Sequence, residues 1–227
     1  MDRFNKHADL YHLLPPRQSS YRLFHSTKTA ITIIHNDIVR AIDAGEVSVL
    51  VLLDLGAAFD TVDHDVLLDV FQKRFRVECC ALDWFRSYLS NRTQSFCITS
   101  GQSALVSLPC SVPQGSRIGP QEFIVYTEDI TETIADFSLN HHLEHLRRRH
   151  AAPKELTYCG HKNNLELCVA AITHWCSSRR LQLNADKTEL IWFGPRSNQK
   201  KLMQAETNLY LGSTIIEPAA IVRNLGV

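Results

Sequence analysis

The run VSVLVLL, from Val47 to Leu53, is the feature that most restricts how this chain can fold. It is continuous, apolar and rich in β-branched residues, a pattern typical of a strand that is buried on both faces. It is too short to span a bilayer, so it does not predict a membrane segment. Because Asp54 follows it directly, the sequence places a carboxylate at the end of a buried strand, where the backbone fixes its direction.

Composition places the chain among ordinary globular proteins. The 227 residues are 44% hydrophobic and 21% charged, which is enough apolar material for a real core. Lys plus Arg equals Asp plus Glu at 24 each, so any binding of nucleic acid needs a local basic groove. The seven cysteines lack a framework spacing and no signal peptide precedes them. We therefore expect reduced thiols, an intracellular location in cytoplasm or nucleus, and no membrane.

Periodicity predicts the secondary structure along the chain. Ile31, Ile34, Ile38 and Ile42 recur at helical spacing, with Ser26 or Thr27 as a cap and Gly45 as a stop. Further elements are expected in this order: helices over 63–75 and 80–91, a hairpin over 94–110, helices over 121–137 and 164–180, two strands over 181–194, and strand-like segments after 208. This order favours an α+β fold with helices on one face of an antiparallel sheet.

Four motifs occur in a fixed order: LLDLGAAFDTVDH, WFRSYLSNRTQSFCI, SVPQGSRIGP and RRLQLNADKTELIWFG. With QSSYRLFHSTKTA upstream and VRNLGV at the end, they resemble the reverse transcriptase domain of LINE-type (non-LTR) retrotransposons along nearly the whole chain. The resemblance implies one partial domain, with residues 1–45 as a fingers remnant and 46–227 as the palm, and with the thumb absent. It also implies an RNA-directed DNA polymerase that uses Mg²⁺, an RNA template, a DNA primer and deoxynucleoside triphosphates.

The resemblance assigns a catalytic and metal-binding role to Asp54. Nucleotide addition needs divalent ions that clamp the attacking and leaving oxygens, and the Leu55 carbonyl could join such an ion. The alternative is an aspartate that starts a turn or caps the next helix. Lys187 matches a lysine that the family sets near the triphosphate, where it neutralises developing charge. Its alternative is a solvated lysine in a turn.

The resemblance places three more residues at the nucleotide. Phe59 would pack against the sugar and exclude a 2′-hydroxyl, although it could equally be a core phenylalanine. Gln114 can donate to a base or sugar, and Gly115 lets the backbone approach the nucleotide closely. A plain turn is the alternative for this PQG loop. Asp60 and His64 of the first motif are expected to be structural.

Three positions depart from the family pattern in and after the PQG loop. Arg117 stands where the family has an aliphatic residue, and Gln121 and Glu122 stand where it has apolar ones. These polar residues leave the packing of the following helix open.

The second half of the metal site is missing from the sequence. The family carries a YADD turn soon after a segment like NHHL, but here Arg147, Arg148 and Arg149 follow instead. Codons for Tyr-Ala-Asp-Asp-Thr-Gln-Leu, shifted by one base, can read Leu-Arg-Arg-Arg-His-Ala-Ala, which is the run 146–152. We therefore interpret 144–164 as a disrupted, out-of-frame loop that removes a central hairpin of the sheet.

Several readings of function remain open. One carboxylate and a set of guanidinium groups cannot hold two divalent ions, which predicts an inactive polymerase fragment. A zinc site is disfavoured because the spacings are irregular. Its candidate ligands are His141, His142, His145, His150, Cys159, His161, Cys168 and Cys176. The alternatives are a non-catalytic nucleic-acid or protein binding module on the palm scaffold, or a chain that forms no stable protein. The sequence leaves the oligomeric state open.

Overall fold

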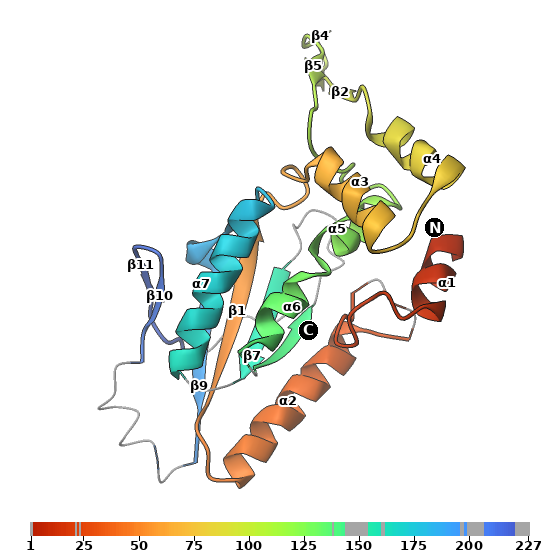
Figure 1. Ribbon diagram of the computed structural model, residues 1–227. Coiled ribbons are helices and arrows are strands. Elements are labelled where there is room, and N and C mark those ends of the chain that lie inside the picture. Colours follow the sequence, from red (N-terminus) through yellow and green to blue (C-terminus); the bar gives the residue numbers. More distant parts are fainter. Residues whose placement is uncertain are drawn as a thin grey trace. The chain divides into compact units, whose positions relative to one another are not determined.

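The computed structural model describes residues 2–20, 22, 24–137, 139–143, 154–159, 162–195, 198 and 207–220 (Figure 1). The chain divides into two compact units. Unit 1 consists of Met1–Leu14 and Phe59–Glu128, and unit 2 of Pro15–Ala58 and Asp129–Val227. The sequence predicted a boundary at residue 45. The division does not follow it, because the predicted helix before residue 45 and the predicted strand after it both belong to unit 2.

Unit 2 is built on a five-stranded antiparallel sheet. Its central strand is β1 (Ser48–Gly56), which contains the apolar run and ends just beyond Asp54. On one side β1 pairs with β7 (Lys154–Cys159), which pairs in turn with β6 (Asn140–Leu143). On the other side it pairs with β9 (Glu189–Phe193) and, near its end, with β8 (Gln182–Leu183). The expected α+β class with an antiparallel sheet is confirmed.

Helix α2 (Thr27–Asp43) packs its apolar stripe against β1. Its start is fixed by Ser26, whose side chain accepts from the Thr29 amide while the Thr29 hydroxyl accepts from the Ser26 amide. Ile38 then packs with Leu50 and Leu52 of the strand. The side chains of the opposite face of β1 are also buried, so the strand is covered on both faces as predicted.

The remaining elements of unit 2 are α6 (Ile130–Ala135), α7 (Lys162–Ser178), the 3₁₀ turn η1 (Ala185–Lys187), β10 (Leu209–Leu211) and β11 (Thr214–Ile216). Helix α7 buries the stripe of Leu165, Val169 and Ile172. An ion pair between Arg179 and Asp129 ties the residue after α7 to the start of α6. The two strands around a turn expected over 181–194 are β8 and β9, with η1 between them.

The prediction of a disrupted loop over 144–164 is wrong for most of the second half of this range. Lys154–Cys159 form β7, and α7 begins at Lys162. Backbone pairing with both β1 and β6 stabilises β7, so a central hairpin of the sheet is retained. Residues 144–153, which carry the arginine run and the start of the supposed frame change, lie outside the described residues.

Unit 1 is built from helices α1 (Asp2–Leu10), α3 (His64–Lys73), α4 (Cys79–Leu89) and α5 (Gly119–Thr127). Phe71 joins α1, α3 and α4: its ring stacks on Phe85 at 4.1 Å and meets Phe4 and Phe75 edge-on. The hairpin expected over 94–110 appears as two ladders, β2 (Thr93–Gln94) with β5 (Val106–Ser107), and β3 (Cys97–Ile98) with β4 (Gly101–Gln102). The single helix expected over 121–137 is two helices, because α5 ends at Thr127 and α6 starts at Ile130.

Within the described ranges, no helix combines the length and the apolar character that crossing a bilayer requires.

Candidate functional site

Asp54 and Lys187 lie together at the end of β1. Asp54 is 3% exposed, and its Oδ2 lies 3.9 Å from Nζ of Lys187, whose side chain is 58% exposed. The backbone explains the approach, because the Asn184 amide donates to the Asp54 carbonyl at 2.7 Å and so holds η1 beside the strand end. Two residues that the sequence assigned to one site are therefore neighbours, a carboxylate and an ammonium group.

The strand on the other side of Asp54 contains a register shift. Leu53 pairs with Leu156 and Asp54 pairs with Lys154, so Glu155 is the extra residue of a β-bulge. No local sequence pattern marks Glu155, because a bulge is defined only by the pairing of two strands. The bulge thus brings the backbone of an acidic residue next to that of Asp54, with a lysine directly opposite.

The described residues do not fit a pair of divalent ions. Nowhere among them do three or more His, Cys, Asp or Glu side chains gather in a way that could hold a metal ion. Asp54 and the Leu55 carbonyl supply far fewer oxygens than two such ions require. The aspartate pair of the family pattern would fall in 144–153, outside the described part, and there Glu144 is the one acid in the sequence.

The zinc alternative gains no support from the part of the chain that can be seen. His145, His150 and His161 lie outside the described residues. Cys168 and Cys176 are buried in α7, and burial raises the pKa of the Cys176 thiol to about 12. Because zinc is bound by thiolate, a cysteine that keeps its proton is a poor ligand.

In unit 1, Phe59 is joined to the start of the PQG loop by the backbone. The Val112 amide donates to the Phe59 carbonyl at 2.9 Å, and the Ser111 amide donates to the Val62 carbonyl at 2.9 Å. The half-buried ring of Phe59 also lies 5.3 Å from the ring of Phe123, which is fully buried. The structure therefore brings Phe59 and the PQG loop together, and it leaves both readings of the ring, sugar contact and core residue, compatible with its position.

Two polar side chains hold the carbonyl of Ser111, next to this loop. Nε2 of His64 lies 2.7 Å from that oxygen and Nη1 of Arg92 lies 2.8 Å from it. Since a carbonyl only accepts, Nε2 of His64 carries the proton. Asp63 caps α3 by accepting from the Asp65 and Val66 amides. The structural role expected for His64 is consistent with these bonds, which fasten the loop before Pro113.

The PQG loop is a tight turn whose glycines are required by geometry. Gly115 has φ +80°, a conformation that L side chains rarely adopt. A Cβ on Gly119 would lie 2.7 Å from the Pro113 carbonyl oxygen, so no side chain fits there. Ser116 closes the turn by accepting from the Gly119 amide at 2.8 Å. Gln114 and Gly115 are exposed at its tip, where a ligand could reach them.

The helix that follows the turn contains an acid in its buried face. Glu122 is 0% exposed, and among the described residues neither of its carboxylate oxygens has a hydrogen-bond partner. Burial raises the pKa of Glu122 to about 7, although the charge of Arg92 lowers it somewhat. Helix α5 thus forms despite its polar residues, and it does so around an acid whose protonated form is far more populated at neutral pH than that of an exposed glutamate.

Known sequences resemble this chain over most of its length. A family described as reverse transcriptase (RNA-dependent DNA polymerase) matches residues 1–215. A probable RNA-directed DNA polymerase from transposon BS of Drosophila melanogaster is 26% identical over 220 residues, which cover 95% of this chain and 24% of the relative. The RNA-directed DNA polymerase from mobile element jockey of the same species is 23% identical, with 96% and 25% covered. The chain thus spans about a quarter of the length of these curated relatives.

Solved structures give the same fold. A Candida albicans telomerase, in complex with a TWJ fragment of telomeric RNA, superposes with a TM-score of 0.57 at 13% identity, covering 83% of this chain and 34% of the telomerase. An apo telomerase from Candida tropicalis gives 0.55 at 14% identity, covering 73% and 34%. At such identities the likeness concerns the fold alone. Taken with the match over residues 1–215, it identifies the antiparallel sheet of unit 2 as a palm: the chain belongs to the reverse transcriptase family and is related to polymerases of LINE-type mobile elements.

Proposed function

We propose that this chain is a reverse transcriptase palm that does not add nucleotides, because its metal site lacks the carboxylates that divalent ions need. By family, the partners are an RNA template, a DNA primer, deoxynucleoside triphosphates and Mg²⁺. Phosphoryl transfer of this kind depends almost entirely on positioning and charge neutralisation by the ions. A palm without a complete ligand set therefore keeps the scaffold and loses the chemistry.

The observation that carries the proposal is the shortage of metal ligands around Asp54: among the described residues, no three His, Cys, Asp or Glu side chains gather as a metal site requires. The neighbour of its carboxylate is instead the Lys187 ammonium, whose Nζ lies 3.9 Å from Oδ2. An ammonium has no acceptor to offer a metal ion, and its charge opposes binding of a second cation at the same oxygen. Asp54 would then be a remnant of the catalytic site with its charge offset by the protein itself.

The nucleotide side of the site supports descent from an active enzyme. The glycine geometry of the PQG turn and the backbone bond between Val112 and Phe59, which keep the turn tight and hold Phe59 next to it, support this descent. In this proposal Leu55, Phe59, Gln114, Gly115 and Lys187 are remnants of nucleotide binding.

A second candidate is a binding module without catalysis. The observation that favours it is the hairpin of unit 1, where four large apolar side chains are exposed: Phe96 by 70%, Ile98 by 72%, Leu105 by 69% and Val106 by 56%. Exposed apolar groups gathered on one element mark interaction surfaces. A salt-dependent affinity for RNA–DNA hybrid that survives Asp54→Asn would support this candidate.

Primer extension on an RNA template tests the proposal directly. The purified chain is assayed with Mg²⁺ and then with Mn²⁺, beside Asp54→Asn and Glu155→Gln variants, after a urea transition has shown that each is folded. We expect no extension from any of them. Extension that Asp54→Asn abolishes would overturn the proposal. If Glu155→Gln abolishes it as well, the acid in the bulge completes the metal site.

A further inference from the structure

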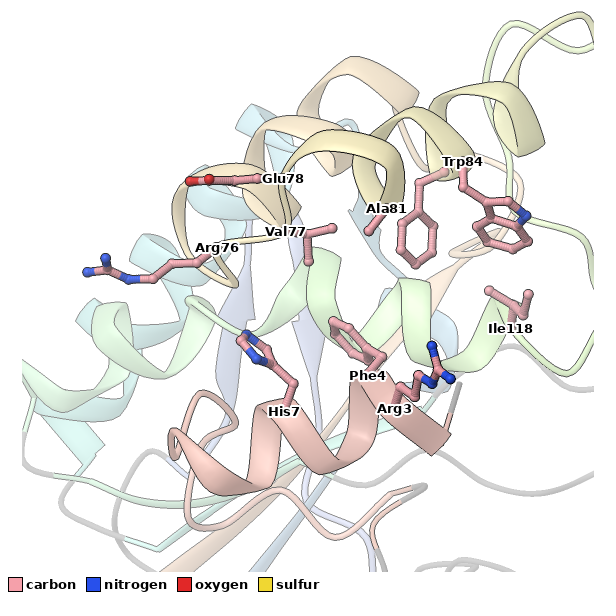
Figure 2. A pocket seen from close by; sticks show the side chains of 10 residues that line it. Arg3, Phe4, His7, Arg76, Val77, Glu78, Ala81, Trp84 and Ile118 are labelled. Atoms are coloured by element: carbon pink, nitrogen blue, oxygen red, sulfur yellow. The ribbon is translucent and has the colours of Figure 1, made fainter.

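Unit 1 contains a cavity of about 840 Å³ between α1 and α4 (Figure 2). It is separate from the residues assigned to the nucleotide site, none of which lines it. Its volume falls within the range of small-molecule sites, roughly 300–1,000 Å³.

The wall is mainly apolar, and Phe4, Trp84 and Phe85 are its large aromatic residues. Phe4 of α1 is held against Phe71 and Phe75, with ring centroids 5.7 and 5.5 Å apart. Trp84 of α4 is 49% exposed although it is a large apolar residue, and Tyr88 stacks on it at 5.3 Å with nearly parallel planes. Phe85 meets the same indole with ring centroids 5.1 Å apart and planes at 81°, and about half of the Trp84 side chain stays open beside these two rings. A flat ring entering the cavity can stack there.

Contacts between lining residues and the core behind them hold the wall of the cavity in place. Nε2 of His7 lies 2.9 Å from the Phe75 carbonyl, which fastens α1 to the chain just after α3. Phe71 and Phe75, against which Phe4 rests, are both 0% exposed. Phe4 thus rests on the core of unit 1, and a ligand would meet a wall that is already formed.

Charge is distributed unequally along the cavity. Figure 2 shows Arg76 and Glu78 at one end of the view, where their opposite charges offset each other. Arg3 lies toward the other end, with Trp84 and Ile118, and no acid lines the cavity there. Among the residues that the structure describes, the Arg3 guanidinium has no ion-pair partner. An anionic group is the complement of this end.

We propose that this cavity binds a planar aromatic ring that bears a phosphate, the ring stacking on Trp84 and Phe4 and the phosphate pairing with Arg3. A guanidinium fits phosphate oxygens with two parallel hydrogen bonds, and an indole stacks on any nucleobase. The same chemistry is offered by a free nucleotide and by one unstacked nucleotide of a single strand.

Calorimetric titration of the full chain with AMP, adenosine and ribose 5-phosphate tests the site. AMP is expected to bind, adenosine more weakly, and ribose 5-phosphate weakest, because it lacks the ring. Arg3→Gln should weaken AMP binding about tenfold and leave adenosine within a factor of about two. Trp84→Ala should weaken AMP and adenosine alike, by about tenfold, and Trp84→Phe should restore most of the loss.

Arg40→Gln is the matched control, because it removes an exposed arginine of α2 that lies outside the cavity. No AMP binding by the folded parent chain would overturn the proposal. So would AMP binding that Arg3→Gln and Trp84→Ala leave unchanged while both variants unfold at the parent's urea midpoint.

A single-stranded oligoadenylate distinguishes the two sources of the ligand. Binding more than about tenfold tighter than AMP, and weakened by Trp84→Ala, assigns the cavity to one nucleotide of a strand. Affinity equal to that of AMP for each nucleotide assigns it to free nucleotides. Both outcomes keep the site and name its occupant.

Discussion

Strand β1 and helix α5 are both buried and both contain an acid, but they contain it at different places. In β1 the apolar run comes first, and Asp54 stands at its end, beside an ammonium that reaches solvent. In α5, Glu122 is the fourth of nine helical residues and the first of six consecutive buried ones, and among the described residues its oxygens accept no hydrogen bond. An acid at the end of a buried element can keep its charge, whereas an acid within it is pushed toward its neutral form.

The largest loss of stability should come from placing an acid in the middle of β1, as α5 already contains one. Val51 is 0% exposed and pairs with Tyr158 on one side and Leu190 on the other. Val51→Glu places an acid in the middle of the strand, with no cation to pair with it, and is expected to cost more than about 4 kcal/mol. Urea denaturation measures the loss. Val51→Ala controls for size at about 2 kcal/mol. Equal losses for the two variants would show that β1 tolerates an acid as α5 does.

The next largest change in stability should come from removing the buried acid of α5, so that the helix is apolar inside as β1 is. The folded pKa of Glu122 is raised to about 7 from the usual 4.5, so the proton stabilises the fold fully below pH 4.5. That contribution is lost as the pH rises to about 7. Glu122→Leu should therefore stabilise the chain more at pH 8 than at pH 4.5, and the difference should be on the order of 3 kcal/mol.

Urea midpoints for parent and variant at several pH values measure this difference. Glu122→Gln is the matched control, because it removes the titration and keeps a polar group of the same shape. It should flatten the pH dependence without the full gain of leucine. A gain from leucine that is constant between pH 4.5 and 8 would contradict the buried-acid account.

The smallest effect concerns the pair that ends β1. Lys187→Met removes the ammonium beside Asp54, and because the lysine side chain is 58% exposed, the expected loss is below about 1 kcal/mol. The loss should shrink further in high salt, and urea midpoints at low and high salt would measure it. Lys73→Met, which removes the exposed partner of Asp69 on α3, is the control for an ordinary surface pair. A loss of several kcal/mol at Lys187 alone would mean that Asp54 depends on this partner.

The elements that the sequence predicted well are those whose signals are local. The isoleucine spacing and the Ser26 cap predicted α2, and the β-branched run predicted β1. The break between α5 and α6 was missed, because the apolar pattern continues across Glu128 and Asp129 while the units change there. Helix α1 was not predicted, because it is short and mostly polar, and Phe4 finds its partners Phe71 and Phe75 far along the chain.

The residues of the candidate site were likewise predicted only where a local motif marks them. Asp54, the PQG turn and Lys187 were named from motifs, and the structure places Asp54 beside Lys187 and Phe59 beside the turn. The roles assigned to these residues stay predictions. Glu155 and the return of the chain as β7 could not be foreseen, because the preceding segment carries no family pattern and the bulge exists only through pairing with β1.

The division of the chain has a consequence for how the protein is made. Unit 1 interrupts unit 2, so β1 leaves the ribosome long before β9, its partner along Ser48–Leu52. At ordinary rates of synthesis the strand waits on the order of 10 s with its edges open. During that time the longest apolar run of the chain is a template for pairing with other chains, so the order of synthesis, and not only the finished fold, exposes this protein to aggregation.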